Sequence, residues 1–185
     1  MKSMINIKLT LVALLMLAVG LSSFTGTKKA ESKVNWLTFE EAIEANKANP
    51  KKIFIDIYTD WCGWCKKMDA QTFNHPDIAA YMNENFHNVK FDAEQSEEVV
   101  FNGHTFKFIP GGRKGVHELA VALTNNNLSY PMGVFMDEEF RILSPLPGYQ
   151  KAPFFDAVLR YFGEENYKSM KWDEFMKGYD SPLGD

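Results

Sequence analysis

Cysteine is scarce in this sequence, which contains two in 185 residues, Cys62 and Cys65. A framework of several disulfides and a four-cysteine zinc site are therefore excluded. The two intervening residues, Gly63 and Trp64, give a spacing at which both sulfurs can meet across one helical turn. Such a pair can cycle between a dithiol and a disulfide with little backbone movement.

Positive charge is also limited. The chain carries 20 Lys and Arg residues against 24 Asp and Glu residues, its formal net charge is -4, and it contains no basic run. Domains that bind nucleic acid typically present a basic patch or stripe. Nucleic acid is therefore not expected among the partners.

Long apolar runs are absent as well. The stretch Leu9–Leu21 holds thirteen apolar or small residues, fewer than the roughly 20 that a membrane-spanning helix needs. Lys2 and Lys8 precede it and small polar residues follow, which is typical of a secretory signal peptide. We expect a signal peptide over residues 1–25, a flexible leader over 26–35, and no stable membrane insertion after cleavage. The protein is then secreted across the cytoplasmic membrane, to the periplasm, where disulfides persist.

The cysteine pair admits a structural and a redox interpretation. A bridge stabilises a fold mainly by closing a long loop of the unfolded chain, so a ring this small contributes little. The apolar run Ile53–Tyr58 before the pair predicts a strand buried on both faces, followed by a helix that begins at the cysteines. This strand and helix context favours redox chemistry.

The segment Asp56–Lys66 resembles the active-site segment of the thioredoxin family. The likeness includes both cysteines and an acid six residues before the first, with Gly63-Trp64 in place of Gly-Pro. The following Thr72–Pro76 resembles the thioredoxin-like domain of periplasmic disulfide-interchange proteins. The resemblance implies one α/β thioredoxin-like domain over residues 36–185, with a central mixed β-sheet flanked by helices.

Three residues are expected to carry the chemistry. Cys62 would be the attacking thiol, because the dipole at a helix N-terminus favours the thiolate, and Cys65 would resolve the mixed disulfide. Asp56 is an acid inside a buried strand, which is costly unless it is protonated or paired. The resemblance implies that Asp56 accepts the proton of Cys65, with a structurally paired aspartate as the alternative.

Five further residues are expected to bind substrate. Trp61 and Trp64 would flank the cysteines as apolar walls around Gly63, although either could serve packing alone. The resemblance implies a cis peptide bond at Pro131. It also implies that Pro131 and the backbone of Tyr130 pair with the substrate chain.

Local patterns predict the remaining elements. Thr38 and Glu41 form a capping box that begins a first helix, and a second helical stretch from Pro76 includes Phe86. Asn102-Gly103 predicts a β-hairpin within an insert at about residues 96–115, which we expect to lie near the active-site face and to select partners. A C-terminal helical extension at 164–185 is expected to cover apolar surface of the domain.

Metal binding is the first competing hypothesis. The cysteine pair and a histidine could bind zinc or copper, but no two histidines stand at a recognised ligand spacing. His117-Glu118 is instead expected to be a surface pair on a helix. We therefore expect no metal and no cofactor beyond the redox-active disulfide. The four histidines are His75, His87, His104 and His117.

The favoured function is a secreted thiol–disulfide oxidoreductase, a reductase or isomerase, that acts on protein disulfides. Its expected partners are proteins with disulfides or thiols and a membrane protein that donates electrons. A thioredoxin-fold binding module without redox turnover is the alternative from another class.

Overall fold

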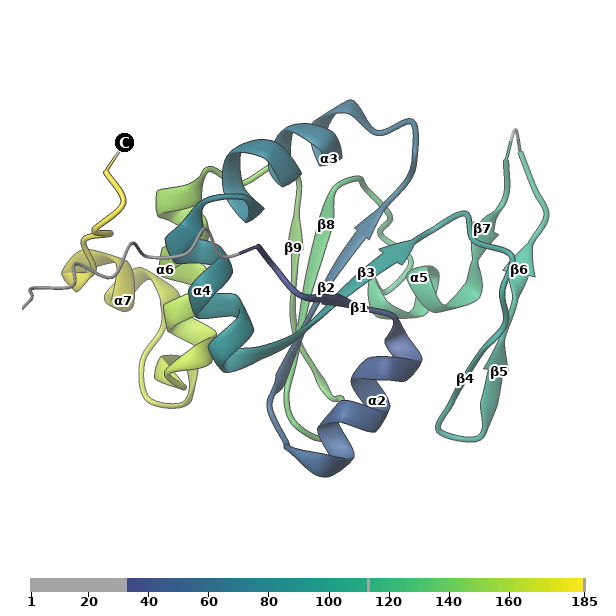
Figure 1. The fold of residues 1–185 in the computed structure, drawn as a ribbon, viewed down its shortest axis with the longest axis horizontal. Coiled ribbons are helices and arrows are strands. Elements are labelled where there is room, and N and C mark those ends of the chain that lie inside the picture. Colours follow the sequence, from purple (N-terminus) through teal and green to yellow (C-terminus); the bar gives the residue numbers. More distant parts are fainter. Residues whose placement is uncertain (1–32, 113, 185) are drawn as a thin grey trace, which may run out of the picture. The chain divides into compact units, whose positions relative to one another are not determined.

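A five-stranded mixed sheet forms the centre of the computed structural model, which describes residues 33–112 and 114–184 (Figure 1). The strand order is β1-β3-β2-β8-β9. The strands are β1 (Trp36–Leu37), β2 (Lys52–Tyr58), β3 (Phe86–Asp92), β8 (Met132–Met136) and β9 (Ile142–Pro147). β1, β3 and β2 run parallel, whereas β8 and β9 pair in antiparallel fashion. The expected central mixed sheet is confirmed.

β2 lies in the middle of the sheet because its residues are almost all apolar and both of its faces are covered. Alternate side chains point to opposite faces of a strand. Ile53, Ile55 and Ile57 therefore join one core, and Phe54 joins the other. Asp56 is the exception, fully buried and directly opposite Lys90 of β3.

Helices cover both faces of the sheet (Figure 1). Their apolar residues divide between the two cores, with α2 and α5 contributing to the first and α3, α4 and α6 to the second. The helices are α2 (Phe39–Ala48), α3 (Gly63–Met68), α4 (Pro76–Asn85), α5 (Glu118–Leu123) and α6 (Ala152–Gly163). A π-helical turn, η1 (Asp69–Phe73), continues α3.

Local signals fix several element ends, including the start of α2, which the sequence predicted. The Thr38–Glu41 capping box is present at the start of α2. Asn125 and Asn126 have φ values of 50° and 63° just after α5, the left-handed conformation that ends helices. The expectation that Phe86 belongs to the helix from Pro76 is wrong. Phe86 is instead the first residue of β3, and its side chain packs in the second core.

The insert contains two short β-ribbons. The expected hairpin is confirmed as β4 (Val99–Phe101) and β5 (His104–Phe106), and it is followed by an unpredicted pair, β6 (Phe108–Ile109) and β7 (Val116–His117). Val99 is fully buried, and the ring of Phe101 lies 5.2 Å from that of Phe39 in α2. One side of the hairpin therefore belongs to the main core.

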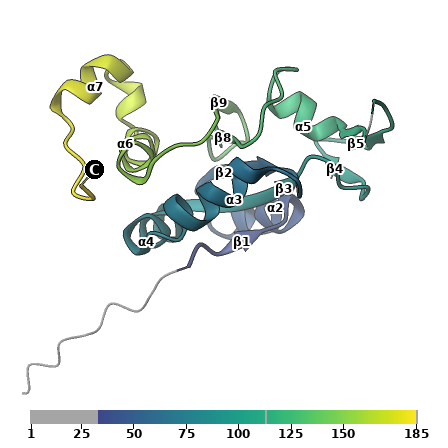
Figure 2. The same ribbon diagram turned by 90° about the horizontal axis from the view of Figure 1, so that it is seen from above.

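The C-terminal extension packs on α6. It contains a 3-10 turn, η2 (Asn166–Lys168), and a short helix, α7 (Trp172–Gly178), which lies beside α6 (Figure 2). The rings of Trp172 and Phe175 each lie 5.2 Å from that of Tyr161. α7 thus covers apolar surface of the domain, as expected.

His117 is buried, so the expectation of a surface pair with Glu118 is wrong. Its Nδ1 accepts the backbone N–H of Leu119 at 3.1 Å, and its Nε2 lies 3.0 Å from the carbonyl oxygen of Glu97. An imidazole can be buried when both ring nitrogens are bonded. His117 thereby caps the N-terminus of α5.

The expected signal peptide and most of the expected leader lie outside the described residues. Val34, at the end of that leader, is buried in the second core. The backbone N–H of Asn35 donates to Asn83 Oδ1 at 2.8 Å. Within residues 33–112 and 114–184, no helix is both long enough and apolar enough to cross a membrane.

Candidate redox site

The two cysteines form a disulfide at the N-terminus of α3. Their sulfurs are 2.07 Å apart and their Cα atoms 5.3 Å apart. Cys62 is the N-cap residue, and its Sγ accepts the backbone N–H of Cys65 at 3.0 Å. The N–H of Cys62 donates to the carbonyl oxygen of Thr59, which closes the turn after β2.

The helix position distinguishes the two sulfurs more than exposure does. Cys62 is 5% exposed and Cys65 is 3% exposed in the disulfide form. Cys62 lies at the positive end of α3, where unpaired N–H groups stabilise a thiolate. Cys65 lies within the first turn. This difference makes Cys62 the better candidate for the attacking thiol.

Two aromatic pairs flank the disulfide. The ring of Trp61 meets Tyr130 edge to face at 5.8 Å, and the ring of Trp64 lies 5.6 Å from Tyr149. Both tryptophans are more than half exposed, at 56% and 57%. Gly63 between them leaves open space where a Cβ would stand. The surface beside the sulfurs is thus apolar and accessible.

The Tyr130-Pro131 peptide bond is cis, as the thioredoxin resemblance implies. Pro131 directly precedes β8, and its carbonyl oxygen accepts the backbone N–H of Gly148 at 2.8 Å. The contact between Tyr130 and Trp61 places this peptide bond beside the cysteine turn. The structure therefore brings together the neighbours of Cys62 and of Pro131, which are far apart in the sequence.

Asp56 and Lys90 form an ion pair in which the carboxylate is buried and the lysine is partly exposed. Lys90 Nζ donates to Asp56 Oδ2 at 2.6 Å and also to Asp69 Oδ1 in η1. Burial raises the pKa of Asp56 to about 6, and the ammonium of Lys90 limits that rise. Asp56 Oδ1 has no hydrogen-bond partner within the described part of the chain. One oxygen of a carboxylate that titrates near neutral pH is therefore available to accept a proton.

Lys90 and Asp69 were missed in the sequence, although a signal for Lys90 existed. Lys90 is a charged residue between the apolar residues Val89 and Phe91, and the parallel pairing of β3 with β2 places it directly opposite Asp56. Its ammonium also lies 5.0 Å from the ring centroids of Trp36 and Tyr58. Burial lowers the pKa of Lys90, but the two carboxylates outweigh that effect and raise it.

The insert reaches the cysteine turn. The indole N–H of Trp61 donates to Glu94 Oε1 at 2.8 Å, and Lys114 Nζ lies 3.3 Å from Glu94 Oε2. Trp61 and Lys114 line a cleft of about 480 Å³ with Gly111 and Gly115. The expectation that the insert lies near the active-site face is confirmed.

The four histidines are separate from the cysteine pair and have partners of their own. His75 caps α4, His87 bonds the carbonyl oxygen of Asn49, and His104 lies 3.9 Å from Glu118. No group of three or more His, Cys, Asp or Glu residues is placed to hold a metal ion among residues 33–112 and 114–184.

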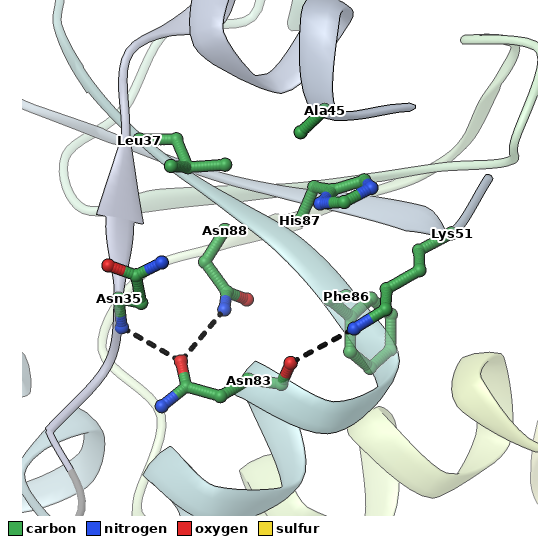
Figure 3. A pocket seen from close by; sticks show the side chains of 8 residues that line it. All are labelled: Asn35, Leu37, Ala45, Lys51, Asn83, Phe86, His87 and Asn88. Carbon is green, nitrogen blue, oxygen red and sulfur yellow. Dashed lines mark hydrogen bonds between the residues drawn. The ribbon is translucent and has the colours of Figure 1, made fainter. Parts of the chain in front are cut away.

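A smaller hollow of about 280 Å³ lies at the other end of the parallel β2–β3 pair (Figure 3). Asn83 Oδ1 accepts hydrogen bonds from the Asn35 backbone and from Asn88 Nδ2, and its carbonyl oxygen accepts one from Lys51 Nζ. These polar groups bond one another. The hollow is therefore best explained as a structural junction between β1, α4 and β3.

Together, the mixed sheet, the Cys-x-x-Cys pair at a helix N-terminus and the adjacent cis-proline define a thioredoxin-like protein. The comparisons agree with this class. Residues 17–152 match the family model Thioredox_DsbH, whose description is "Protein of unknown function, DUF255". The chain belongs to this family.

Individual relatives share low sequence identity with this chain. Spermatogenesis-associated protein 20 of Rattus norvegicus is 26% identical over 132 residues, which make up 71% of this chain and 15% of that protein. The chain thus spans a small part of this relative's length. Among solved structures, a DsbH oxidoreductase is similar with a TM-score of 0.53 and 19% sequence identity. The match covers 81% of this chain and 98% of the DsbH chain. A thioredoxin-fold protein from Helicobacter pylori has a TM-score of 0.53 at 22% identity, covering 70% and 80%. At these identities the structures show a shared fold.

Proposed function

We propose that this protein is a thiol–disulfide oxidoreductase, acting as a reductase or isomerase on protein disulfides outside the cytosol. The observation that carries the proposal is the Cys62–Cys65 disulfide at the N-terminus of α3, directly after the buried central strand. A short bridge in this position contributes little stability. The pair does supply two sulfurs that can be oxidised and reduced without a bound cofactor.

The proposed reaction begins with the reduced pair. The Cys62 thiolate attacks one sulfur of a substrate disulfide, forms a mixed disulfide and releases the other substrate sulfur as a thiolate. Cys65 then loses its proton and attacks Cys62 Sγ, which releases the second substrate sulfur. The substrate gains two electrons and two protons, and the protein ends as the Cys62–Cys65 disulfide.

Asp56 is proposed as the acceptor of the Cys65 proton, through water. Its buried carboxyl has a pKa of about 6 and an oxygen without a hydrogen-bond partner in the described residues. A general base is most effective when its pKa lies near the working pH. Lys90 and Asp69 would tune this base and would not touch the substrate.

Trp61, Gly63, Trp64, Tyr130 and Pro131 are proposed to bind the substrate chain. The two exposed indoles belong to the residues directly before Cys62 and directly before Cys65, and a Cβ at Gly63 would meet open space. The backbone of Tyr130 would pair with an extended substrate segment. This set of residues suits proteins as substrates because it offers an apolar surface together with main-chain groups.

Secretion and the electron donor are part of the proposal. The pattern of residues 1–25 supports export, which would place the cysteines in a compartment where disulfides persist. Repeated reduction of substrates there needs a donor of two electrons per cycle, which we propose to be a membrane protein.

A reduction potential and an insulin-type reductase assay test this proposal. We expect a reversible two-electron potential between about -270 and -120 mV, and insulin reduction that is lost in Cys62→Ala. A cysteine pair that remains oxidised at potentials far below this range, in a protein that does not reduce insulin, would instead indicate a structural bridge. Sequencing the N-terminus of the exported protein would test signal cleavage separately.

A further inference from the structure

A cleft lies between Trp61 and the insert. Trp61 directly precedes Cys62, the proposed attacking cysteine, in the sequence. The volume of the cleft is about 480 Å³, and its walls are the side chains of Trp61, Glu94 and Lys114 with the backbone at Gly111 and Gly115. Pockets that bind ligand groups typically combine an aromatic wall with a few fixed polar groups. Trp61 provides the aromatic wall here, and Glu94 provides the fixed polar group.

The Glu94 carboxylate is held in one orientation. Its Oε1 accepts the indole N–H of Trp61 at 2.8 Å, and its side chain is 18% exposed. The opposite wall is also constrained, because Gly115 has φ +79° and a Cβ there would lie 2.5 Å from the carbonyl oxygen of Ile109. The N–H of Gly115 donates to the carbonyl oxygen of Gly111 at 2.6 Å. The walls of the cleft are therefore held in place by contacts within the protein.

Lys114 already places a cation in this cleft, but it is loosely held. Its Nζ lies 3.3 Å from Glu94 Oε2 and 5.8 Å from the centroid of the Trp61 ring, and its side chain is 54% exposed. A carboxylate beside an aromatic face is the arrangement that binds ammonium and guanidinium groups. Lys114 thus shows which kind of group the cleft accepts.

Further negative charge lies near Glu94, one of the residues that line the cleft. Burial raises the pKa of Asp92, and the neighbouring carboxylates of Asp60 and Glu94 add to that rise while Lys114 opposes it. The carboxylates of Asp92, Asp60 and Glu94 are thus close enough to interact with one another, and the Lys114 ammonium partly offsets their charge. The resulting field favours an incoming cation.

We propose that this cleft binds a lysine or arginine side chain of the substrate protein, close in sequence to the cysteine that Cys62 attacks. The substrate cation would displace the Lys114 ammonium, lie against the Trp61 ring and pair with Glu94. Because Trp61 directly precedes Cys62, this contact would position the substrate disulfide for attack. The inference rests on the proposed function and adds a substrate class to it.

Synthetic peptides test the inference directly. Each peptide carries one internal disulfide with arginine, alanine or glutamate on one flank, and the reduced mature protein is mixed with each at low ionic strength. The second-order rate constant of exchange is measured by acid quench and chromatography. We expect arginine peptides to react about tenfold faster than glutamate peptides, with alanine between them.

Three variants locate the effect. Glu94→Gln keeps an acceptor for the Trp61 N–H but removes the charge, so the ratio of arginine to alanine rates should fall to about twofold or less. Lys114→Met removes the competing ammonium and should increase that ratio. Glu98→Gln is the matched control, because Glu98 is an exposed acid of the insert paired with Lys107; it should leave the ratio unchanged.

The outcomes separate this inference from the proposed function. Equal rates for the three peptides, or equal effects of Glu94→Gln and Glu98→Gln, would overturn the cation site while leaving the oxidoreductase proposal intact. No exchange with any peptide would overturn the oxidoreductase proposal itself.

Discussion

Lys90 lies directly opposite Asp56 in the parallel β2–β3 pairing, with its Nζ 2.6 Å from Asp56 Oδ2. The carboxylate is buried and the lysine is partly exposed, and the lysine also bonds Asp69. Burial raises the pKa of Asp56 to about 6 in spite of the nearby ammonium. The relationship makes Asp56 both a candidate proton acceptor and a source of pH-dependent stability.

The first prediction is that Asp56→Asn removes a pH-dependent loss of stability. In the wild type, the folded pKa of about 6 exceeds the unfolded value of 3.8. The folded state therefore binds the proton more tightly, and stability is lost as pH rises from about 4 through about 6. The difference of about two pKa units corresponds to about 3 kcal/mol. Denaturant unfolding of the oxidised proteins from pH 4 to pH 8 measures it.

The informative quantity is how the free energy of unfolding of each protein changes with pH, because Asp56→Asn also removes one partner of Lys90. That loss shifts the free energy of unfolding of the variant at every pH in this window, since Lys90 stays charged throughout. Relative to the wild type, the variant should gain about 3 kcal/mol between pH 4 and pH 8. Parallel curves for the two proteins would show that Asp56 does not titrate in this range.

The second prediction concerns Asp69, which shares Lys90 with Asp56. Asp69→Asn removes a negative charge that raises the pKa of Asp56 and leaves Lys90 to pair with Asp56 alone. The pKa of Asp56 should fall as a result. Carbon-13 NMR titration of the Asp56 carboxyl measures this directly, and Asp173→Asn on the exposed side of α7 is the control. An unchanged pKa in Asp69→Asn would show that the second carboxylate has no influence.

Local patterns account for the parts of the fold that the sequence predicted. Thr38 and Glu41 specify a helix start through bonds three residues apart, and Asn102-Gly103 specifies a hairpin through its own φ values. The apolar run of β2 predicts a central strand because it leaves no face for solvent. In each case the deciding interactions lie within the segment itself or depend on burial alone.

The missed features depend on contacts between distant segments. Lys90 pairs with a residue 34 positions away, and its role appears once the register of β2 and β3 is assigned. His117 could be called buried only once the carbonyl of Glu97 and the N–H of Leu119 were known to bond its ring. The β6–β7 pair has two residues per strand, too few for a periodic pattern.

The third prediction separates recognition by the insert from its role in packing. Val100 and Ile109 are apolar side chains of the insert that are 61% and 43% exposed. Replacing both with serine should change stability by less than about 1 kcal/mol but slow the reduction of protein disulfides relative to a small disulfide such as hydroxyethyl disulfide. Val99→Ala, which truncates a fully buried neighbour, should instead cost about 1.5 kcal/mol or more. Equal slowing on both substrates would contradict a recognition role.

The fourth prediction is that acid opens the start of α5. Burial lowers the pKa of His117, so its folded state favours the neutral ring. Stability contributed by His117 is therefore present above the unfolded pKa of about 6.5 and is lost as pH falls below it. Protonation also removes the acceptor for the Leu119 N–H. Hydrogen exchange at Leu119 should lose protection between pH 7 and pH 5, after correction for intrinsic rates, whereas His117→Asn should lack this pH dependence.

The last prediction follows from the order of attack. A substrate captured by Cys62 is released when Cys65 attacks the mixed disulfide, so removing Cys65 should stop the reaction at the covalent intermediate. An exported Cys65→Ala variant should accumulate as complexes with other proteins, seen as reductant-sensitive bands on gels. Cys62→Ala should give few complexes, because Cys65 lies within α3 and lacks the N-cap position that stabilises a thiolate. The double variant provides the background.

A structural bridge predicts no complexes with either single variant, and a metal site predicts equal loss of metal from both. Mass spectrometry of the bands from Cys65→Ala would identify the natural substrates, and their sequences near the trapped cysteine would show whether lysine or arginine is enriched there.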